Sequence, residues 1–570
     1  MQRHPPSSTQ TAIDVYVRTY YSLLRSSGEV WVRAFEEAHA YSESSLHAGA
    51  REAAPDVAAF AYSAARLPDC MTRVQRVVLG QSHEQFEAAG HDVRTWDRVR
   101  ARGRRRAMAQ SGDVLAVFVT SASDIDDLVP ILTAFQIEWN KLHTRLAAAA
   151  GTRVLGGARD GVDDVALAAA LGVAQPDVSS LLAAVSIADL TEIAARPLDL
   201  SIRVLSGSFS EYQRASQRWW SGIETSYLRQ TRPRRRPVYF VSSNTHSLVN
   251  LVGGYARAHQ SDITEFARRR NPEGLAPELD RALAAGDAAE VSNITYYLLR
   301  AFLHDAEGDT EARLAEVQRF DAESGIDTIE SPGRVDVSAQ IIELGRLKPD
   351  RLDPRVRVPG IERLAASDAV LINIDYPLGM AAYHHLSRMA QGVGEIRGVY
   401  VMGKAATLNG RVGDVMISSV VHDEHSENTY LFRNCFGAAH VQPWLARATV
   451  LDNQKALTVL SAFLQNPAYM SSFYGEGYTV MEMEAGPYLS GIYELVFPTR
   501  HPEDEVVHLS NATPFDVGVL HYASDTPYSR RQSLLSKSLS YFGVESTYAC
   551  SIAIMRRILE GELARLGGAA

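Results

Sequence analysis

The stretch that decides the fold is residues 369–403, AVLINIDYPLGMAAYHHLSRMAQGVGEIRGVYVMG. Its first and last apolar runs, AVLINID and GVYVMG, are short, continuous and rich in β-branched residues, which is typical of strands buried on both faces. Between them, GMAAYHHLSRMAQ (379–391) has the apolar spacing of a helix. Two buried strands joined by a helix predict a β-α-β unit, and therefore an α/β fold.

The same pattern extends over residues 236–570, where we predict an α/β domain with a central mixed sheet. The run NQKALTVLSAFLQ (453–465) has helical spacing, and we expect a helix there. A polar helical segment at about 255–330 interrupts the strands, and we predict that it is an insertion. Further runs of strand length recur around it: VYFVSS, DVSAQIIEL, DVMISSVV, TYLFRN, ATVLD, YTVMEME and VGVLHYASD.

The N-terminal part has a different pattern. Residues 12–24, 57–67 and 127–150 have apolar residues at helical spacing. One segment, VLAVFVT (114–120), is short and β-branched enough to be a strand, and a buried helix turn is the alternative. We predict a mainly α-helical N-terminal domain over residues 1–235, with no assigned role. The proline-flanked cluster RPRRRP (232–237) would end its last helix and link the two domains.

Composition narrows the class of protein. The 570 residues are 46% apolar and 22% charged, an ordinary globular balance, and the net charge of -10 argues against nucleic-acid binding. Three cysteines cannot form a disulfide framework, which favours a reducing compartment. The opening MQRHPPSSTQ has no apolar core of a secretory signal, and no run approaches the ~18 apolar residues of a membrane span. We expect a cytoplasmic protein that binds neither nucleic acid nor membrane.

Polar and small residues follow the predicted strands. Ligands of open α/β sheets bind beyond the carboxyl ends of the strands. Small residues there let backbone N–H groups approach a ligand, and carboxylates bind hydroxyl groups or transfer a proton. The segments concerned are Tyr376-Pro377-Leu378-Gly379, Gly403-Lys404-Ala405-Ala406-Thr407, Met481-Glu482-Met483-Glu484-Ala485 and Ser524-Asp525-Thr526-Pro527.

Three motifs in this order resemble those of the nucleoside phosphorylase and nucleosidase superfamily, which includes purine nucleoside phosphorylase, methylthioadenosine nucleosidase and AMP nucleosidase. MGKAATLNGRVGDVMI (402–417) resembles its glycine loop and the VGDVVI strand after it. VMEMEAGPY (480–488) resembles its VEMEA strand and helix start, and YASDTP (522–527) its late strand ending in Ser-Asp. The resemblance covers about 236–565. It implies a phosphorylase-like sheet and cleavage of the N-glycosidic bond of a purine nucleoside or nucleotide.

The resemblance also implies roles for residues. Cleavage makes the ribose positive in an oxocarbenium-like transition state, and the leaving base must be protonated. Asp525 matches the family's acid, which needs a raised pKa, and Glu484 matches the carboxylate that accepts hydrogen bonds from the ribose 2′- and 3′-hydroxyls. Met483 matches the residue under the sugar. Further substrate contacts are expected from these motifs and from positions near them: Gly379, Gly403, Lys404, His422, Phe473, Tyr474, Glu482 and Ser524.

Other interpretations stay open for these side chains. Glu484 could instead cap the helix that follows it, and Asp525 could form an Asx turn after its strand. Lys404 could be an ion-paired surface lysine. His422-Asp423-Glu424-His425 has no third cluster at zinc spacing, so we predict no metal site there. The segment 501–514 lengthens the gap between the two carboxylates, and we predict a hairpin or lid for it.

Two departures from the family pattern bear on the nucleophile. Val401 stands where phosphorolytic members have an arginine, and Lys404 stands where a hydroxyl is expected. Hydrolytic members also lack that arginine, so we favour water, with no cofactor. The alternatives are inorganic phosphate as co-substrate, held by Lys404, Arg530 or Arg531, and a nucleotide sensor without activity on the same fold. The superfamily commonly forms homo-oligomers, and we expect one here.

Overall fold

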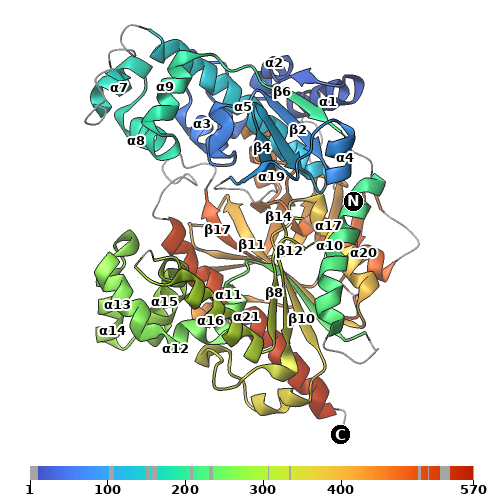
Figure 1. Ribbon diagram of the computed structural model, residues 1–570. Helices are drawn as coiled ribbons and strands as arrows, with labels where there is room; N and C mark the ends of the chain where they lie inside the picture. Colours follow the sequence, from blue (N-terminus) through green and yellow to red (C-terminus); the bar gives the residue numbers. More distant parts are fainter. Residues whose placement is uncertain are drawn as a thin grey trace.

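The computed structural model contains two sheets, each flanked by helices (Figure 1). It describes residues 11–101, 108–148, 151, 154–155, 163–205, 209–229, 235–305, 307–332, 335–497, 502–510, 513–526 and 539–568. Three stretches fall partly outside these residues: the arginine-rich run RVRARGRRR (98–106), the glycine-rich run 151–164, for which the composition predicts a loop, and the RPRRRP linker (232–237). Arg530 and Arg531 fall outside the described residues entirely.

The N-terminal region is mainly helical, as predicted, but it also contains a sheet. Its described strands form one six-stranded sheet in the order β1-β6-β2-β5-β4-β3, in which β6, β2 and β5 are parallel. Only β5 coincides with a predicted strand. The strands are β1 (Val30–Trp31), β2 (Arg76–Gly80), β3 (Asp97–Val99), β4 (Met108–Ser111), β5 (Val114–Phe118) and β6 (Ser201–Val204).

Helices surround this sheet. The longest N-terminal helix, α5, begins where the Asp124 carboxylate accepts hydrogen bonds from the N–H groups of Thr120 and Ser121, so the start of the helix is capped. The helices are α1 (Thr11–Ser26), α2 (Arg33–Tyr41), α3 (Val57–Ala64), α4 (His83–Ala88), α5 (Ala122–Leu146), α7 (Asp164–Leu171), α8 (Gln175–Ala184), α9 (Ile187–Ala195) and α10 (Phe209–Arg229).

The C-terminal region contains the predicted mixed sheet. Its described strands run in the order β16-β13-β12-β14-β15-β11-β7-β10-β9-β8, and β17 pairs with both β11 and β12. The strands are β7 (Val238–Ser243), β8 (Ile326–Ile329), β9 (Ala339–Glu343), β10 (Val370–Asp375), β11 (Ile396–Thr407), β12 (Val415–Asp423), β13 (Asn428–Leu431), β14 (Val450–Thr458), β15 (Tyr478–Glu482), β16 (Val506–His508) and β17 (Asp516–Asp525).

Part of this sheet closes on itself. β17 is parallel to β11 and antiparallel to β12, while β12 connects through β14 and β15 back to β11. β10, β7, β11 and β17 are consecutive neighbours, which confirms that the four runs expected in one sheet lie together. Closure places β15 and β17 on opposite sides of β11.

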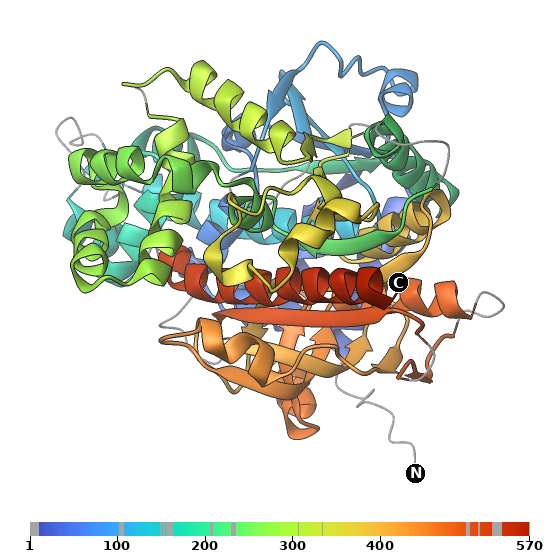
Figure 2. The ribbon, with the colours of Figure 1, turned by 90° about the horizontal axis from the view of Figure 1, so that it is seen from below.

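Helices cover both faces of the sheet, and helices α12 to α16 occupy most of the segment 255–330, which ends in strand β8. α21 runs along β17 on the underside of the molecule (Figure 2). The helices are α11 (Ser247–Gly253), α12 (Tyr255–Ala258), α13 (Gln260–Arg270), α14 (Ala276–Ala285), α15 (Ala288–Leu303), α16 (Thr310–Glu323), α17 (Met380–Gly392), α18 (Ala438–Val441), α19 (Pro467–Gly475), α20 (Ala485–Val496) and α21 (Leu539–Gly568). Short 3₁₀ turns are η2 (Ser45–His47), η3 (Asp69–Thr72), η5 (Pro272–Gly274), η7 (Leu344–Arg346), η8 (Pro354–Val356), η9 (Ile361–Ala366) and η10 (Gln442–Trp444).

Two local predictions were wrong. The expected helix at 453–465 is strand β14 as far as Thr458 and then turns and irregular backbone. Parallel partners on both sides, β12 and β15, stabilise the extended backbone of the strand part. In the segment 501–514, the described residues 502–510 contain β16, which pairs in parallel with β13. This part therefore adds an edge strand to the sheet and not the expected hairpin, and the alternative of a lid stays a prediction.

The two regions share their cores. Phe463 and Leu464, which follow β14, are buried in the N-terminal hydrophobic cluster with residues such as Tyr62. In the opposite direction, Trp219 and Trp220 of α10 are buried in the cluster beneath the C-terminal sheet. The division at residue 235 and the insertion at 255–330 stay predictions.

No single described helix is long and apolar enough to cross a membrane. One bent pair, α7 with α8, passes that test by length and composition alone, and its Leu167, Leu171, Val178 and Leu181 are buried in the N-terminal core.

Candidate functional site

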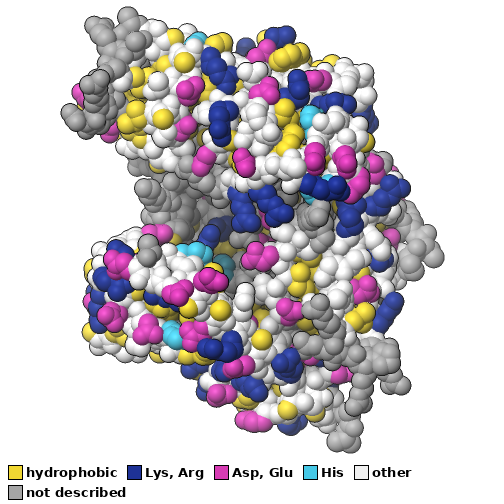
Figure 3. All heavy atoms as spheres, viewed as in Figure 1, with side chains coloured by type: hydrophobic (Ala, Val, Ile, Leu, Met, Phe, Trp, Pro, Cys, Tyr) yellow, Lys and Arg dark blue, Asp and Glu magenta, His cyan; other side chains and the backbone are white. Residues whose placement is uncertain are grey.

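A cavity of about 1280 Å³ lies between the two regions. The carboxyl ends of strands from both sheets reach it. From the C-terminal sheet, residues at or after the ends of β7, β10, β15 and β17 line it, and from the N-terminal sheet, residues after β2 and β5 do so. Figure 3 shows Lys and Arg side chains gathered where the upper and lower parts of the molecule meet. Ligands of α/β sheets bind beyond the carboxyl ends of parallel strands. In this protein the carboxyl ends of strands from both sheets meet at the same cavity.

Most of the predicted site residues line this cavity. They come from β11, from the β15–α20 junction and from the end of β17. The residues are Gly403, Lys404, Glu482, Met483, Glu484, Ser524 and Asp525. The structure therefore brings the three motifs to one site.

Glu482 holds the β15–α20 junction in place. Its Oε2 accepts hydrogen bonds of 2.7 Å from the N–H groups of Glu484 and Ala485, and its Oε1 accepts one from the Thr458 hydroxyl. Burial raises its pKa to about 7, against the opposing effect of these donors. Glu482 therefore satisfies N–H groups at the start of α20.

Glu484 occupies the N-cap position of α20, but its side chain makes no capping hydrogen bond. The alternative that Glu484 caps the helix is therefore wrong, because Glu482 performs that task. Glu484 is instead one of the residues that line the cavity.

Asp525 ends β17 on the other side of β11. Ser524 Oγ donates to its Oδ1 over 3.0 Å. Burial raises the pKa of Asp525, while the Ser524 hydroxyl and the positive charges of Arg66 and Lys404 act in the opposite direction. A raised pKa is the property that a general acid needs.

Gly403 and Lys404 lie within a strand. The sequence predicts a glycine loop here, but β11 continues to Thr407, because β17 pairs with it as far as Ala406. A Cβ at Gly403 would meet His521 and Tyr376 only at 3.6 and 3.8 Å, so the strand does not require glycine there. The Lys404 side chain is exposed at the cavity.

The remaining predicted contacts lie outside the cavity lining. Phe473 is buried against His422, with ring centroids 5.6 Å apart, and Tyr474 is 47% exposed at the surface. His422 Nδ1 lies 3.0 Å from Thr429 Oγ1, and burial lowers its pKa to about 4. Their roles, and that of Gly379, stay predictions.

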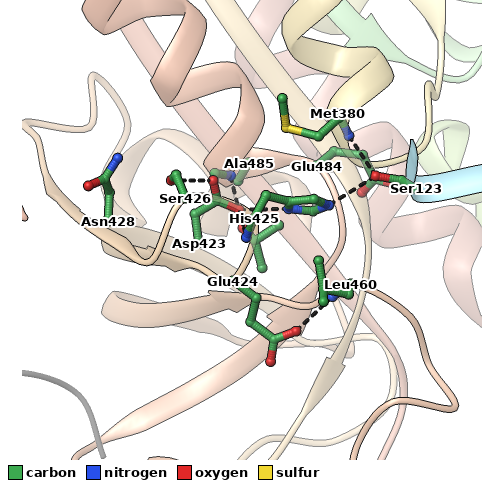
Figure 4. Close-up of polar contacts among 12 residues, drawn as sticks. Ser123, Met380, Asp423, Glu424, His425, Ser426, Asn428, Leu460, Glu484 and Ala485 are labelled. Carbon is green, nitrogen blue, oxygen red and sulfur yellow. Dashed lines mark hydrogen bonds and ion pairs between the residues drawn. The ribbon is translucent and has the colours of Figure 1, made fainter. Parts of the chain in front are cut away.

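Ser123, His425 and Asp423 form a buried polar chain between the two regions (Figure 4). Ser123 Oγ lies 3.0 Å from His425 Nε2, and His425 Nδ1 lies 2.8 Å from Asp423 Oδ1. This order resembles a serine-hydrolase triad. However, Ser123 is fully buried, accepts a hydrogen bond from the Met380 N–H and does not line the cavity. The chain connects α5 to the loop after β12.

Gly379 makes this connection possible. A Cβ at this position would lie 2.2 Å from Ser123 Oγ and 3.0 Å from His425 Nε2, and the backbone has φ +52°. Glycine is therefore required by close approach and by conformation.

The N-terminal wall of the cavity consists of residues that were not predicted from the sequence. Gln81, Ser82 and His83 follow β2, and Val119 and Thr120 follow β5. The run RVVLG (76–80) carries the strand signal that would have led to the first of these. Charged side chains that complete this wall are Arg66, Glu84, Arg94, Asp124 and Arg218.

Within the described residues, no group of three or more His, Cys, Asp or Glu side chains is arranged to hold a metal ion.

Solved structures of nucleosidases and a phosphorylase are similar in fold to part of the chain. The 5′-methylthioadenosine/S-adenosylhomocysteine nucleosidase of Neisseria meningitidis is 12% identical, with a TM-score of 0.28, over 42% of this chain and 94% of that chain. The enzyme of the same name from Colwellia psychrerythraea, in complex with adenine, is 11% identical, with a TM-score of 0.26, over 40% and 86%. Uridine phosphorylase isoform 2 of Schistosoma mansoni is 12% identical, with a TM-score of 0.23, over 34% and 71%.

None of the curated proteins matches the sequence. Residues 32–560 match the family described as "Family of unknown function (DUF6909)", and the chain belongs to that family.

Proposed function

We propose that the protein cleaves the N-glycosidic bond of a purine nucleoside or nucleotide, with water as the nucleophile. The observation that carries this proposal is that Glu484 and Asp525 line one cavity from opposite sides of β11. Ala406 of β11 pairs with Met481 of β15 and with Asp525 of β17. Neighbouring strands are about 4.8 Å apart, so the strands that carry the two carboxylates are roughly 10 Å apart. That spacing suits a nucleoside whose ribose and base face different carboxylates.

The chemistry assigns one task to each carboxylate. Glu484 accepts hydrogen bonds from the ribose hydroxyls, and these bonds strengthen as the ribose becomes positive. Asp525, with its raised pKa, donates a proton to the leaving base. Met483 supplies an apolar surface under the sugar.

The environment of Val401 favours water over phosphate. Val401 is buried in the apolar cluster beneath the sheet, where it offers no charge or hydrogen bond to an anion. A phosphorolytic reaction is the second candidate, because Lys404 presents a cation at the same cavity. A nucleotide-binding protein without activity is the third. A homo-oligomeric state and a cytoplasmic location belong to the same proposal.

The test is incubation of the full chain with purine nucleosides and their 5′-monophosphates, with and without inorganic phosphate, followed by chromatography of the products. Free base formed without phosphate, together with ribose from a nucleoside or ribose 5-phosphate from a nucleotide, supports hydrolysis. A sugar that carries a new phosphate at its anomeric carbon, formed only when phosphate is added, supports the second candidate. Binding without turnover would leave the third candidate and contradict the proposed reaction.

A further inference from the structure

The N-terminal wall of the cavity is rich in arginine. Arg66 follows α3, Arg94 lies between α4 and β3, and Arg218 is in α10. None of the three belongs to the part of the chain that resembles nucleosidases.

Arg218 has no ion-pair partner among the described residues. One guanidinium nitrogen donates to the Gln81 carbonyl over 3.0 Å, which leaves its other N–H groups available to a ligand. The side chain is half-buried, and burial lowers its pKa against the opposing charge of Glu84. A half-buried guanidinium that lines a cavity is well placed to bind an anion.

Lys404 faces the cavity from the opposite wall, and it too makes no hydrogen bond or ion pair with the described residues. Arg66 also lines the cavity. Its guanidinium stacks on the Tyr62 ring at 3.3 Å and donates to the Tyr62 carbonyl, and its charge acts on Asp525. Packing against Tyr62 orients this cation at low entropic cost to ligand binding.

The carboxylates on the N-terminal wall are already bonded. Glu84 is ion-paired with Arg94, and Asp124 accepts hydrogen bonds from the Thr120 hydroxyl and from backbone N–H groups. Each of these two carboxylates therefore has a bonding partner other than Arg218.

The cavity is also larger than a nucleoside needs. Sites for drug-sized ligands measure about 300–1,000 Å³, and this one measures about 1280 Å³. Base and ribose beside Asp525 and Glu484 leave room for a further group that extends to the N-terminal wall.

We infer that the N-terminal region supplies an anion subsite, formed by Arg218 and Arg66 opposite Lys404, which binds the phosphate end of a nucleotide substrate. This inference rests on the proposed cleavage reaction and selects nucleotides over nucleosides. It also gives the N-terminal region a role, since the site is incomplete without it.

The experiment compares adenosine, inosine and guanosine with their 5′-monophosphates. Base release gives kcat/KM, and calorimetry gives the dissociation constant for each compound. The variants are Arg218→Gln and Lys404→Gln, and the matched control is Arg214→Gln, an exposed arginine one turn earlier on α10 that does not line the cavity. Because Lys404 has no bond with the described residues, its variant should fold normally even if the other is destabilised, and thermal melting checks both.

We expect nucleotides to exceed nucleosides in kcat/KM by at least about 10-fold. Arg218→Gln should lower the value for the nucleotide by about 10- to 100-fold, as loss of charge-assisted hydrogen bonds does, and leave that for the nucleoside within about twofold. Lys404→Gln should act in the same direction, and Arg214→Gln should have little effect.

Equal loss for nucleoside and nucleotide, or no preference for the nucleotide in the unaltered protein, would overturn the subsite while leaving the reaction intact. If no compound releases base, the proposed reaction fails. Even then, tighter binding of the nucleotide that is lost in Arg218→Gln would support the subsite.

Discussion

Ser123 and His425 are separated by 302 positions, yet Ser123 Oγ and His425 Nε2 lie 3.0 Å apart. The next residue after Ser123, Asp124, lines the cavity from the N-terminal side, and Leu378, just before Gly379, lines it from the other. This contact therefore fixes the two walls of the cavity relative to each other.

Replacing Ser123 by Ala should destabilise the protein. The Met380 N–H would lose its acceptor and His425 would lose a partner in a buried site, at a cost of about 1–3 kcal/mol in the free energy of unfolding. Urea denaturation measures this loss of unfolding free energy. Ser26→Ala, which removes an exposed hydroxyl of α1, is the control and should leave the unfolding free energy nearly unchanged. A second experiment compares labelling by a fluorophosphonate, which reacts with nucleophilic serines. If the unaltered protein is labelled and Ser123→Ala is labelled less, Ser123 is a reactive nucleophile and the structural role is wrong.

The contribution of His425 to stability should depend on pH. Burial alone would lower the pKa of His425, but the charges of Asp423, Asp126 and Glu424 outweigh it, so the pKa is raised. A raised pKa in the folded state means that the stabilisation is fully present below about pH 6.5 and is lost as pH rises through the folded-state pKa.

Glu424 and Glu482, whose pKa values are raised to about 7, titrate in the same range. The measurement is therefore the difference in unfolding free energy between the unaltered protein and His425→Gln from pH 5.5 to 8.5. A difference that stays constant or grows with pH would contradict the prediction.

Gly379→Ala should also disrupt the contact between Ser123 and His425. The new Cβ would overlap Ser123 Oγ and impose strain at φ +52°, where strain alone costs about 1–3 kcal/mol. Thermal melting should show a clear decrease. Gly403→Ala, whose Cβ would meet only ordinary contacts, is the matched control for folding. Equal melting temperatures for the two variants would refute the packing argument.

Phe463→Ala should destabilise the N-terminal core although the residue follows a C-terminal strand. Phe463 is 1% exposed and contacts the rings of Tyr62 and His47, so its truncation should cost about 3–5 kcal/mol. Hydrogen exchange should rise in α3 and α5. Phe497→Ala, at a side chain that is 40% exposed, should have little effect. Unchanged exchange in α3 would contradict the shared core.

The two carboxylates should respond differently to neutral replacement. Asp525→Asn removes the proton donor, so kcat should fall by about 10²–10⁴-fold with little change in substrate binding. Glu484→Gln should weaken binding and turnover together, because the ribose loses a charged acceptor. A substrate whose base leaves without protonation should rescue Asp525→Asn only. Near-normal turnover in Asp525→Asn would remove Asp525 from the mechanism.

The sequence predicted the C-terminal sheet because its strands are continuous apolar runs, and it predicted the cluster at Glu484 and Asp525 because these residues end strands. It missed β1, because a strand of two residues gives little periodic signal. It also missed β2, although the run RVVLG has the composition of a strand. It placed Gly403 in a loop, since pairing of β11 with β17 depends on segments more than a hundred positions apart. The wall containing Arg218, and the Ser123–His425 contact, depend on how the two regions pack, which no local pattern encodes.

The burial of Phe463 and Leu464 in the N-terminal core has a consequence for biosynthesis. The ribosome completes the last N-terminal helix at Arg229, but the core of that region lacks two of its apolar side chains until a point more than two hundred residues further on. At about 5–20 residues per second, the delay is roughly 10–50 s. During that interval the nascent N-terminal region exposes an apolar gap that a chaperone can bind. The part of the chain that is made first is therefore completed late, and translation rate or chaperone supply should limit the yield of folded protein.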